Sequence, residues 1–441
     1  MAIRGLEHFK QERDALQLIL QTSGQNRSPE GQLSTTLVEA MLETAQRIIE
    51  AAEEGKPFIA TSYGNAPELL VALDLPWYPL LLVTYLPTRQ PFVLQEIDEA
   101  VRFGLGTDTC TLIRLGISNV QAGRVPLPTA FVGLLSPCDG ATMLHQAIAH
   151  DDYWRNVPVF CTDPPYWENE HSVDFHAHEL RLMVSFLEEH TGRKLDIDRL
   201  QEVVKESNKQ YKLWAKYNEL RRAVPCPPAA TKGAQAWNIA QNFMVGDPRG
   251  TEWFRKLVAI TEQQVKEGKG YAPNERIRLL WFDVPALWLS ELTKWLRDEW
   301  GACIVMDMMG YPSQTLIDTS SEESMFRGLS KRNLCELPMV RQVHGTADTL
   351  ANDIVQVVKD YKIDCVIWPA HMGHKDGSAS IGIMRQVCRD IGVPFLALGV
   401  DLFDKRYTSI DRLKNRFSEF FSTMGLGKTL PKSRPPSSPF I

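Results

Sequence analysis

Two cysteines stand at positions where a thiol can do chemistry. Cys138 lies in Ser-Pro-Cys-Asp-Gly, directly after the apolar run 130–135 and before a helical stretch. A thiol at the start of a helix feels the positive end of the helix dipole, which lowers its pKa and favours the thiolate that binds a metal or cluster. Cys110, in Asp-Thr-Cys-Thr-Leu, follows the helical stretch through Val101. The alternative for the Cys-Asp pair is an ordinary helix cap provided by Asp139.

Two histidines follow another apolar run. His371 and His374, in His-Met-Gly-His-Lys-Asp, come directly after the run that ends at Trp368. Imidazoles can donate protons or bind metals, and here they can also belong to a capped helix start. No HExxH motif and no third histidine at a usual spacing lies near, which argues against zinc.

Several motifs that would assign a different chemistry are missing from the sequence. It has no GxxxxGK[ST] segment for ATP binding, no GxGxxG after an expected strand and no GxSxG nucleophile turn. The eight cysteines form no CxxC pair, which excludes a zinc ribbon and a dithiol redox motif, and no ferredoxin-type cysteine run occurs.

The composition is that of an ordinary water-soluble protein of two domains. Of 441 residues, 44% are hydrophobic and 23% are charged. The net charge of −6 argues against a nucleic-acid partner, because binding phosphates needs a surplus of clustered cations. The longest apolar stretch, 75–86, is too short to span a bilayer, and the first residues lack the apolar run of a signal peptide. We therefore expect a cytoplasmic protein with no membrane partner.

The elements that position these side chains are short apolar runs alternating with helical patterns. This alternation predicts an α/β fold of two Rossmann- or flavodoxin-like lobes with parallel sheets, joined and flanked by helices. Strands are expected at 58–62, 78–85, 130–135, 157–160, 278–282, 302–306, 364–369 and 394–398. Helices are expected at 7–20, 37–52, 68–73, 95–104, 141–150, within 174–223, and at 287–300, 346–361, 378–391 and 409–421.

The interruption Pro225-Cys-Pro-Pro228 marks the best candidate for a boundary between the lobes. The expected divisions are a helical segment 1–57, a first lobe 58–225, a helical connector 226–274, a second lobe 275–425 and a flexible tail 426–441. Ligands of open parallel sheets bind beyond the carboxyl ends of the strands. Ser62, Tyr63 and Asn65 follow the first strand, so we expect them to contact substrate.

Taken together, these segments resemble the 2-hydroxyacyl-CoA dehydratase and benzoyl-CoA reductase family over roughly residues 55–425. The resemblance rests on four segments in the right order rather than on any one of them. They are Tyr63-Gly-Asn-Ala-Pro-Glu-Leu-Leu-Val-Ala72, Cys110 in Asp-Thr-Cys-Thr-Leu-Ile-Arg-Leu-Gly, Cys138 in Ser-Pro-Cys-Asp-Gly, and Gly392-Val-Pro-Phe-Leu-Ala-Leu398 with Asp401 and the helix 412–417.

The resemblance implies an iron–sulfur cluster of the 4Fe-4S type, held by three cysteines from loops of both lobes. Two of these positions carry over as Cys110 and Cys138. His374 stands where the family usually has the third cysteine, and this departure leaves three possibilities open. His374 binds iron through its imidazole, it donates a proton beside the cluster, or one of three other cysteines takes the vacant position: Cys161, Cys335 or Cys365.

The length and the segment from His371 to Ser380 look most like the larger catalytic subunit of an ATP-dependent benzoyl-CoA reductase. The resemblance implies a related smaller cluster-bearing subunit, ATP-hydrolysing activator subunits that bind ATP in place of this chain, and reduced ferredoxin as the electron source. The implied reaction adds single electrons and protons to benzoyl-CoA through a ketyl radical and yields a cyclohexadiene-carboxyl-CoA. His371 and His374 are the expected proton donors.

Three other functions remain open at this point. A 2-hydroxyacyl-CoA dehydratase subunit would share the fold and the activator but would recycle its electron. A non-catalytic subunit would bind acyl-CoA or act as a scaffold without a cluster, which the missing third cysteine favours. A homodimeric relative with a larger iron–sulfur centre would need more than three converging cysteines.

Overall fold

The computed structural model describes residues 4–23, 28–62, 66–81, 91–135, 138–283, 288–311, 315–338, 340–341 and 347–427. Tyr63 and Asn65 lie outside these residues, as does the tail from 428. Within the described chain, no helix is both long and apolar enough to cross a membrane.

Two four-stranded parallel sheets form the framework, which confirms the expected α/β fold. The first sheet has the order β2-β1-β3-β4 and the second the order β6-β5-β7-β8, so the two lobes share one strand order. The strands are β1 (Ile59–Thr61), β2 (Trp77–Pro79), β3 (Ala130–Leu134), β4 (Val159–Thr162), β5 (Ile277–Trp281), β6 (Ala302–Asp307), β7 (Cys365–His371) and β8 (Phe395–Val400).

Helices make up most of the remainder of the described chain. They are α1 (Leu6–Ser23), α2 (Pro29–Glu54), α3 (Glu68–Ala72), α4 (Val93–Arg102), α5 (Thr111–Gln121), α6 (Asp139–His150), α7 (Glu170–Thr191), α8 (Ile197–Leu220), α9 (Gly233–Asn238), α10 (Pro248–Lys266), α11 (Ser290–Trp300), α12 (Glu322–Lys331), α14 (Ala347–Asp360), α15 (Lys375–Asp390) and α16 (Ile410–Thr423). Short 3₁₀ turns lie at η3 (Pro228–Lys232) and η5 (Met308–Gly310), and π-helical turns at η4 (Ile239–Phe243) and η6 (Arg332–Glu336).

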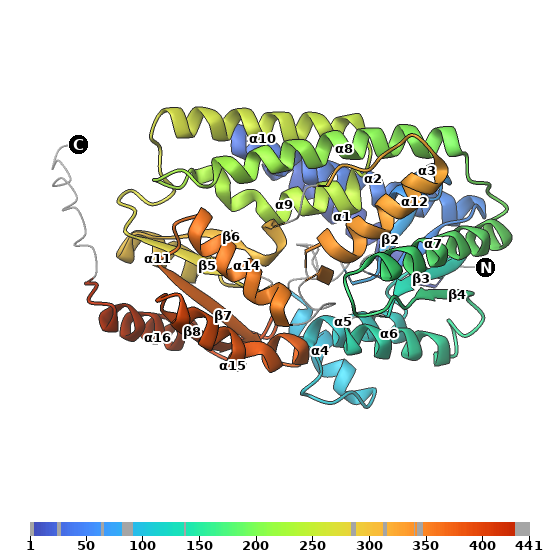
Figure 1. The fold of residues 1–441 in the computed structure, drawn as a ribbon. Coiled ribbons are helices and arrows are strands. Elements are labelled where there is room, and N and C mark those ends of the chain that lie inside the picture. Colours follow the sequence, from blue (N-terminus) through green and yellow to red (C-terminus); the bar gives the residue numbers. More distant parts are fainter. Residues whose placement is uncertain are drawn as a thin grey trace, which may run out of the picture.

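Both sheets are covered by helices on both faces, and this accounts for the continuous apolar runs of their strands. In the first sheet, Phe131 faces a core with α2, α5 and α6, whereas its neighbours in β3 face a core with α7, α8 and α12. In the second sheet, Trp368 faces α14 and α15, and Trp281 faces α11 and α16. The long helices α8 and α10 lie above both lobes in Figure 1.

Local signals explain several helix boundaries. Ser28 caps α2 through the amide of Gly31, Asp196 caps α8 through Arg199, and Ser409 caps α16 through Arg412. Several strand ends differ from their expected positions, because apolar runs locate a strand better than they locate its ends. Within the described residues β2 covers only Trp77–Pro79, and β4 begins two residues later than expected.

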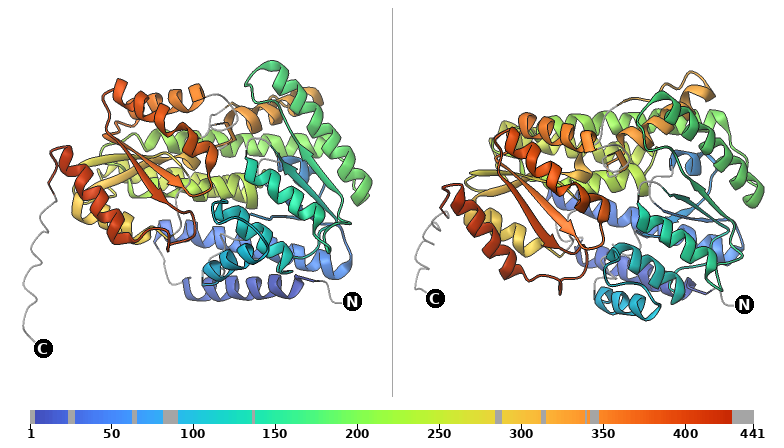
Figure 2. Two further views of the ribbon diagram at one scale, coloured as in Figure 1. Left: turned by 90° about the horizontal axis from the view of Figure 1, so that it is seen from below. Right: turned by 60° about the horizontal axis from the view of Figure 1, so that its bottom comes forward.

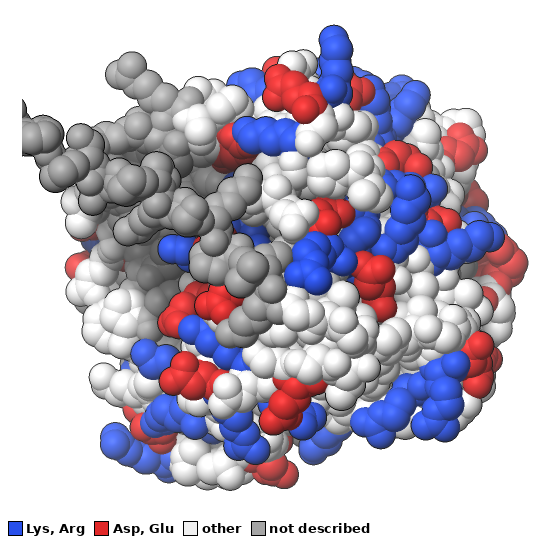
Figure 3. Space-filling view, turned by 90° about the vertical axis from the view of Figure 1, so that its left-hand side faces the viewer, with Lys and Arg blue, Asp and Glu red and all other residues white. Residues whose placement is uncertain are grey.

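The loop after β7 contacts the first lobe, where Gly373 lies against the backbone of Cys110. In both views of Figure 2, the strands of the second sheet point toward the first lobe. Over the described part of the face at the left of Figure 1, Lys and Arg side chains are interspersed with Asp and Glu (Figure 3).

Candidate functional site

Each of the three candidate ligand residues is the N-cap of a helix. Cys110 is the N-cap of α5 and Cys138 is the N-cap of α6, which follows β3. His374 is the N-cap of α15, which follows β7, because this helix begins at Lys375 rather than at the expected residue 378. Helix N-termini carry positive potential, so this arrangement favours anionic ligands or thiolates.

The loop after β7 lies against both cysteine loops. Gly373 has φ +76°, and a Cβ atom at this position would come within 2.1 Å of the backbone nitrogen of Cys110. On the other side of His374, the Nζ atom of Lys375 lies 3.6 Å from Oδ2 of Asp139, the residue after Cys138. At position 373, only glycine permits both the positive φ and the close approach to the backbone of Cys110. His374 is therefore held between the starts of α5 and α6.

The thiols of Cys110 and Cys138 are close enough to influence each other. The pKa of Cys110 is raised to about 12, chiefly by burial and next by the charge of Cys138, while the backbone amides of Ile113 and Leu112 partly offset the rise. Burial thus outweighs the helix N-terminus at Cys110. A metal ion bound there would have to displace the thiol proton.

A buried carboxylate orients His374. Its Nδ1 atom lies 3.3 Å from Oδ1 of Asp283, whose side chain is 2% exposed. Asp283 lies two residues after the end of β5, at the carboxyl end of the second sheet. A carboxylate at this distance stabilises the imidazolium form, or fixes the tautomer whose Nε2 can accept a proton or bind a metal. Sequence analysis missed Asp283, although an acidic residue directly after the expected strand 278–282 was the available signal.

His371 is the last residue of β7, where it pairs in register with Val400 of β8. Its side chain is buried, and its ring centroid lies 6.4 Å from that of His374. The two expected proton donors therefore share one end of the second sheet.

Ser62 lies at the carboxyl end of β1. Its hydroxyl oxygen accepts a hydrogen bond from the amide of Leu134 at 3.1 Å, and its own amide donates to the carbonyl of Val132. These bonds extend the pairing of β1 with β3. The two other residues expected to contact substrate, Tyr63 and Asn65, lie outside the described residues.

The three cysteines considered as substitutes for a third ligand differ in their surroundings. Cys365 begins β7, at the opposite end of the strand from His371. Cys335 lies in η6, whereas Cys161 packs against the same hydrophobic core as Cys110. The pKa values of Cys161 and Cys335 are raised to about 12, chiefly by burial and then by the charges of Asp163 and Glu168 respectively. Among the described residues, no three His, Cys, Asp or Glu side chains are placed to hold a metal ion. The side chains at the starts of α5, α6 and α15 are thus of the types that bind soft metals. Among the described residues, however, no three side chains converge on one metal position.

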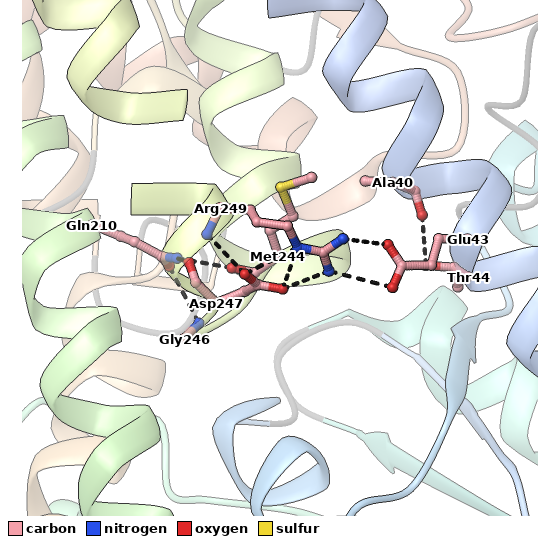
Figure 4. A network of polar contacts seen from close by, with 8 residues as sticks. All are labelled: Ala40, Glu43, Thr44, Gln210, Met244, Gly246, Asp247 and Arg249. Carbon is pink, nitrogen blue, oxygen red and sulfur yellow. Dashed lines mark hydrogen bonds and ion pairs between the residues drawn. The ribbon is translucent and has the colours of Figure 1, made fainter. Parts of the chain in front are cut away.

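A pocket of about 410 Å³ lies elsewhere, at the beginning of β2 and between α2, α8 and α10. Figure 4 shows its central guanidinium, Arg249, between Glu43 and Asp247. The Arg249 side chain donates to Glu43 Oε2 at 2.7 Å and to Asp247 Oδ2 at 2.6 Å. Because its charge is already paired, Arg249 ties α10 to α2 rather than presenting a free cation to a ligand.

Comparisons with known proteins agree on one family. Residues 66–424 match the family described as 2-hydroxyglutaryl-CoA dehydratase, D-component. The chain is 24% identical over 410 residues to one of the subunits of the benzoyl-CoA reductase of Thauera aromatica, covering 85% of this chain and 90% of that relative. It is 23% identical over 314 residues to the alpha subunit of the (R)-2-hydroxyglutaryl-CoA dehydratase of Acidaminococcus fermentans, covering 68% of this chain.

A third relative is the (R)-phenyllactyl-CoA dehydratase alpha subunit of Clostridium sporogenes, 25% identical over 203 residues and 43% of this chain. The chain spans 61% of the length of the Acidaminococcus relative and 48% of the Clostridium relative. The family match covers most of the chain and includes Cys110, Cys138 and His374. This chain therefore belongs to the 2-hydroxyglutaryl-CoA dehydratase D-component family.

Proposed function

We propose that this chain is the iron–sulfur subunit of an ATP-coupled benzoyl-CoA reductase. The observation that carries the proposal is the pair of helix N-caps, Cys110 and Cys138, whose thiols are close enough for the charge of one to raise the pKa of the other. Thiolates are the ligands that iron–sulfur clusters use. We assign both as cluster ligands.

The choice of a reductase over a dehydratase rests on the extent of similarity. The benzoyl-CoA reductase relative aligns over 90% of its length, whereas the dehydratase relatives align over 61% and 48%. All three identities lie between 23% and 25%, so the coverage is what favours the reductase.

His374 is the proton donor in this proposal. Its Nδ1 atom faces the buried carboxylate of Asp283, which stabilises the charged imidazole and directs the other ring nitrogen away. The reaction consumes two electrons and two protons per benzoyl-CoA and yields the cyclohexadiene-carboxyl-CoA. When bound, the cluster supplies single electrons at low potential. This chain's residues orient the acyl group, exclude water and deliver the proton.

The test is iron and acid-labile sulfide analysis, with an EPR spectrum, on the chain purified without oxygen together with its partner subunit. We expect wild type to hold both, and Cys138→Ala to lose the iron and sulfide of this chain while the cluster-bearing partner subunit keeps its own. Iron retained in His374→Ala with loss of activity would identify a proton donor, whereas iron lost in His374→Ala would identify a ligand. A folded wild-type complex with no iron beyond that of the partner subunit would contradict the proposal and favour a scaffolding subunit.

The amount of ATP consumed per turnover distinguishes a reductase from the dehydratase alternative. A reductase consumes electrons and ATP in every turnover, whereas a dehydratase consumes them only for priming. Measuring ATP hydrolysed per product molecule with the activator present decides between them. A ratio far below one per turnover would assign the chain to a dehydratase.

A further inference from the structure

A buried carboxylate of the second lobe reaches across to the helix that Cys110 begins. Asp401 follows β8 and is 1% exposed. Its Oδ1 atom accepts a hydrogen bond from the hydroxyl of Thr111 at 2.8 Å, and also from the amides of Phe403 at 2.8 Å and Asp404 at 2.7 Å. The carbonyl of Asp401 accepts from the indole of Trp288 at 3.0 Å. The carboxylate is thus fixed within its own lobe by the backbone.

Thr111 is the first residue of α5 and is fully buried. Helix starts are usually fixed by a hydrogen bond from the N-cap side chain to the first turn. Cys110 makes no side-chain cap bond of regular geometry, although the amides of Leu112 and Ile113 in the first turn of α5 lie near enough to its thiol to lower the pKa. The hydroxyl of Thr111, held by Asp401, therefore adds a stronger anchor from the other lobe.

A second contact from the same lobe limits the other side of the loop. Gly373 approaches the backbone nitrogen of Cys110 so closely that a Cβ atom would clash at 2.1 Å. Gly373 and Asp401 follow β7 and β8, which are adjacent strands. The end of the second sheet thus holds the Cys110 backbone at two points.

We propose that Asp401 is a positioning residue for Cys110. Through Thr111 it holds the first turn of α5, and with it the Cys110 thiol, in place opposite Cys138. The consequence for metal retention rests on the proposed iron–sulfur function, whereas the positioning itself does not. A side chain held by a rigid second contact keeps its geometry better than one on a fraying helix end.

The direct test is alkylation of the metal-free protein, read residue by residue by peptide mass spectrometry. Thr111→Val removes the hydroxyl at nearly constant volume, and we expect Cys110 to react about tenfold faster, in line with the loss of a hydrogen bond to a charged group. Thr111→Ser keeps the hydroxyl and should stay close to wild type, whereas Asp401→Asn keeps an acceptor but loses the charge and should fall between wild type and Thr111→Val.

The matched control is Thr251→Val. The Thr251 hydroxyl donates to Glu206 Oε1 at 2.6 Å between α10 and α8, away from the cysteines, so its loss should leave Cys110 labelling unchanged. Labelling of Cys161 and Cys335 in the same samples reports general loosening of the fold. Cys110 reactivity that stays at the wild-type rate in folded Thr111→Val would overturn the proposal, as would an equal rise at all three cysteines.

A second arm measures iron and sulfide after anaerobic reconstitution with the partner subunit. After the iron of the partner subunit is subtracted, we expect Thr111→Val to lose most of the iron bound by this chain, and Thr111→Ser to restore it. If wild type itself takes up no iron, the proposed function fails, but the alkylation arm still decides whether Asp401 positions Cys110.

Discussion

The two lobes share one strand order but end in different chemistry at equivalent places. The third strand of the first lobe, β3, is followed by Cys138 at the N-cap of α6, whereas the third strand of the second lobe, β7, is followed by His374 at the N-cap of α15. One lobe thus contributes a thiol and the other an imidazole. The same scaffold in both lobes can thus bring two helix N-caps together even though their side chains differ in chemical type.

An acidic residue follows the first strand of each lobe, and the two acidic residues have different roles. In the second lobe, Asp283 follows β5 and contacts His374. In the first lobe, Glu68 begins α3 and pairs with Arg332 at 3.0 Å, with both side chains at most 4% exposed. Ser207 donates to Glu68 as well, at 2.7 Å. The carboxylate of the first lobe thus stabilises packing, and that of the second serves the candidate site.

The largest effect is expected from removing the partner of the first-lobe carboxylate. Arg332→Met leaves Glu68 buried without its cation, and we expect the free energy of unfolding to fall by about 3–5 kcal/mol. Urea denaturation followed by circular dichroism measures the change. Arg332 also donates hydrogen bonds to the hydroxyl of Ser207 and the side-chain carbonyl of Asn208. The loss of these two bonds accounts for part of the fall in stability.

Two further variants calibrate this prediction. Arg199→Met removes an exposed partner of Glu202, which lies at 3.1 Å, and should cost less than about 1 kcal/mol. Adding Glu68→Gln to Arg332→Met should recover part of the stability, since no uncompensated charge stays buried. Equal losses for Arg199→Met and Arg332→Met would show that the buried pair has no special role.

The first lobe also holds a buried imidazole, in apolar surroundings. Among the described residues, neither ring nitrogen of His145 on α6 has a hydrogen-bond partner, and its side chain is 4% exposed. Burial lowers the pKa of His145 to about 4. The unfolded chain, with a histidine pKa near 6.5, therefore binds more protons between these values, so stability falls as pH falls from about 6.5 to 4.

We expect this histidine to contribute about 3 kcal/mol of acid-induced destabilisation across that range. His145→Leu keeps a similar volume and removes the titrating group, so its stability should fall less between pH 7 and pH 4. Chemical denaturation at a series of pH values measures both curves. Parallel curves for wild type and His145→Leu would contradict a buried neutral imidazole.

The smallest of the three effects concerns the carboxylate of the second lobe. Asp283→Asn keeps the shape of the side chain but loses the charge that faces His374. We expect kcat of the complete enzyme to fall about 10–100-fold, the range found when a group that orients a functional histidine is lost. KM for the acyl-CoA should change little, because Asp283 acts through His374.

Asp390→Asn, at the other end of α15, provides the control. Asp390 is exposed and accepts a hydrogen bond from Gln386 of the same helix, so its loss should leave kcat unchanged. An unaltered kcat in Asp283→Asn would mean that the contact with His374 is structural, and the two lobes would then differ less than proposed.

Much of the fold could be predicted because its signals are local. The strand at 130–135 was evident from a short apolar run followed by a helical pattern, and β3 occupies Ala130–Leu134. Cys138 was identifiable because it stands between a recognisable apolar run and a helix start. Cys110 and His374 were singled out as candidate ligands by the family resemblance, and the helix α5 that begins after Cys110 was not expected. The identical strand order of the lobes was not evident, because it lies in the pairing of strands rather than in residue repeats.

What could not be predicted depends on contacts between distant parts of the chain. Glu68 and Arg332 are 264 positions apart, and Thr111 and Asp401 are 290 apart. The sequence by itself determined the α/β class, the positions of most strands and the residue types at their ends, since burial periodicity and capping act within a few residues. Only the tertiary structure decided that Asp283 faces His374 and that Asp401 holds Thr111, because side-chain partners are chosen by how the two sheets pack together.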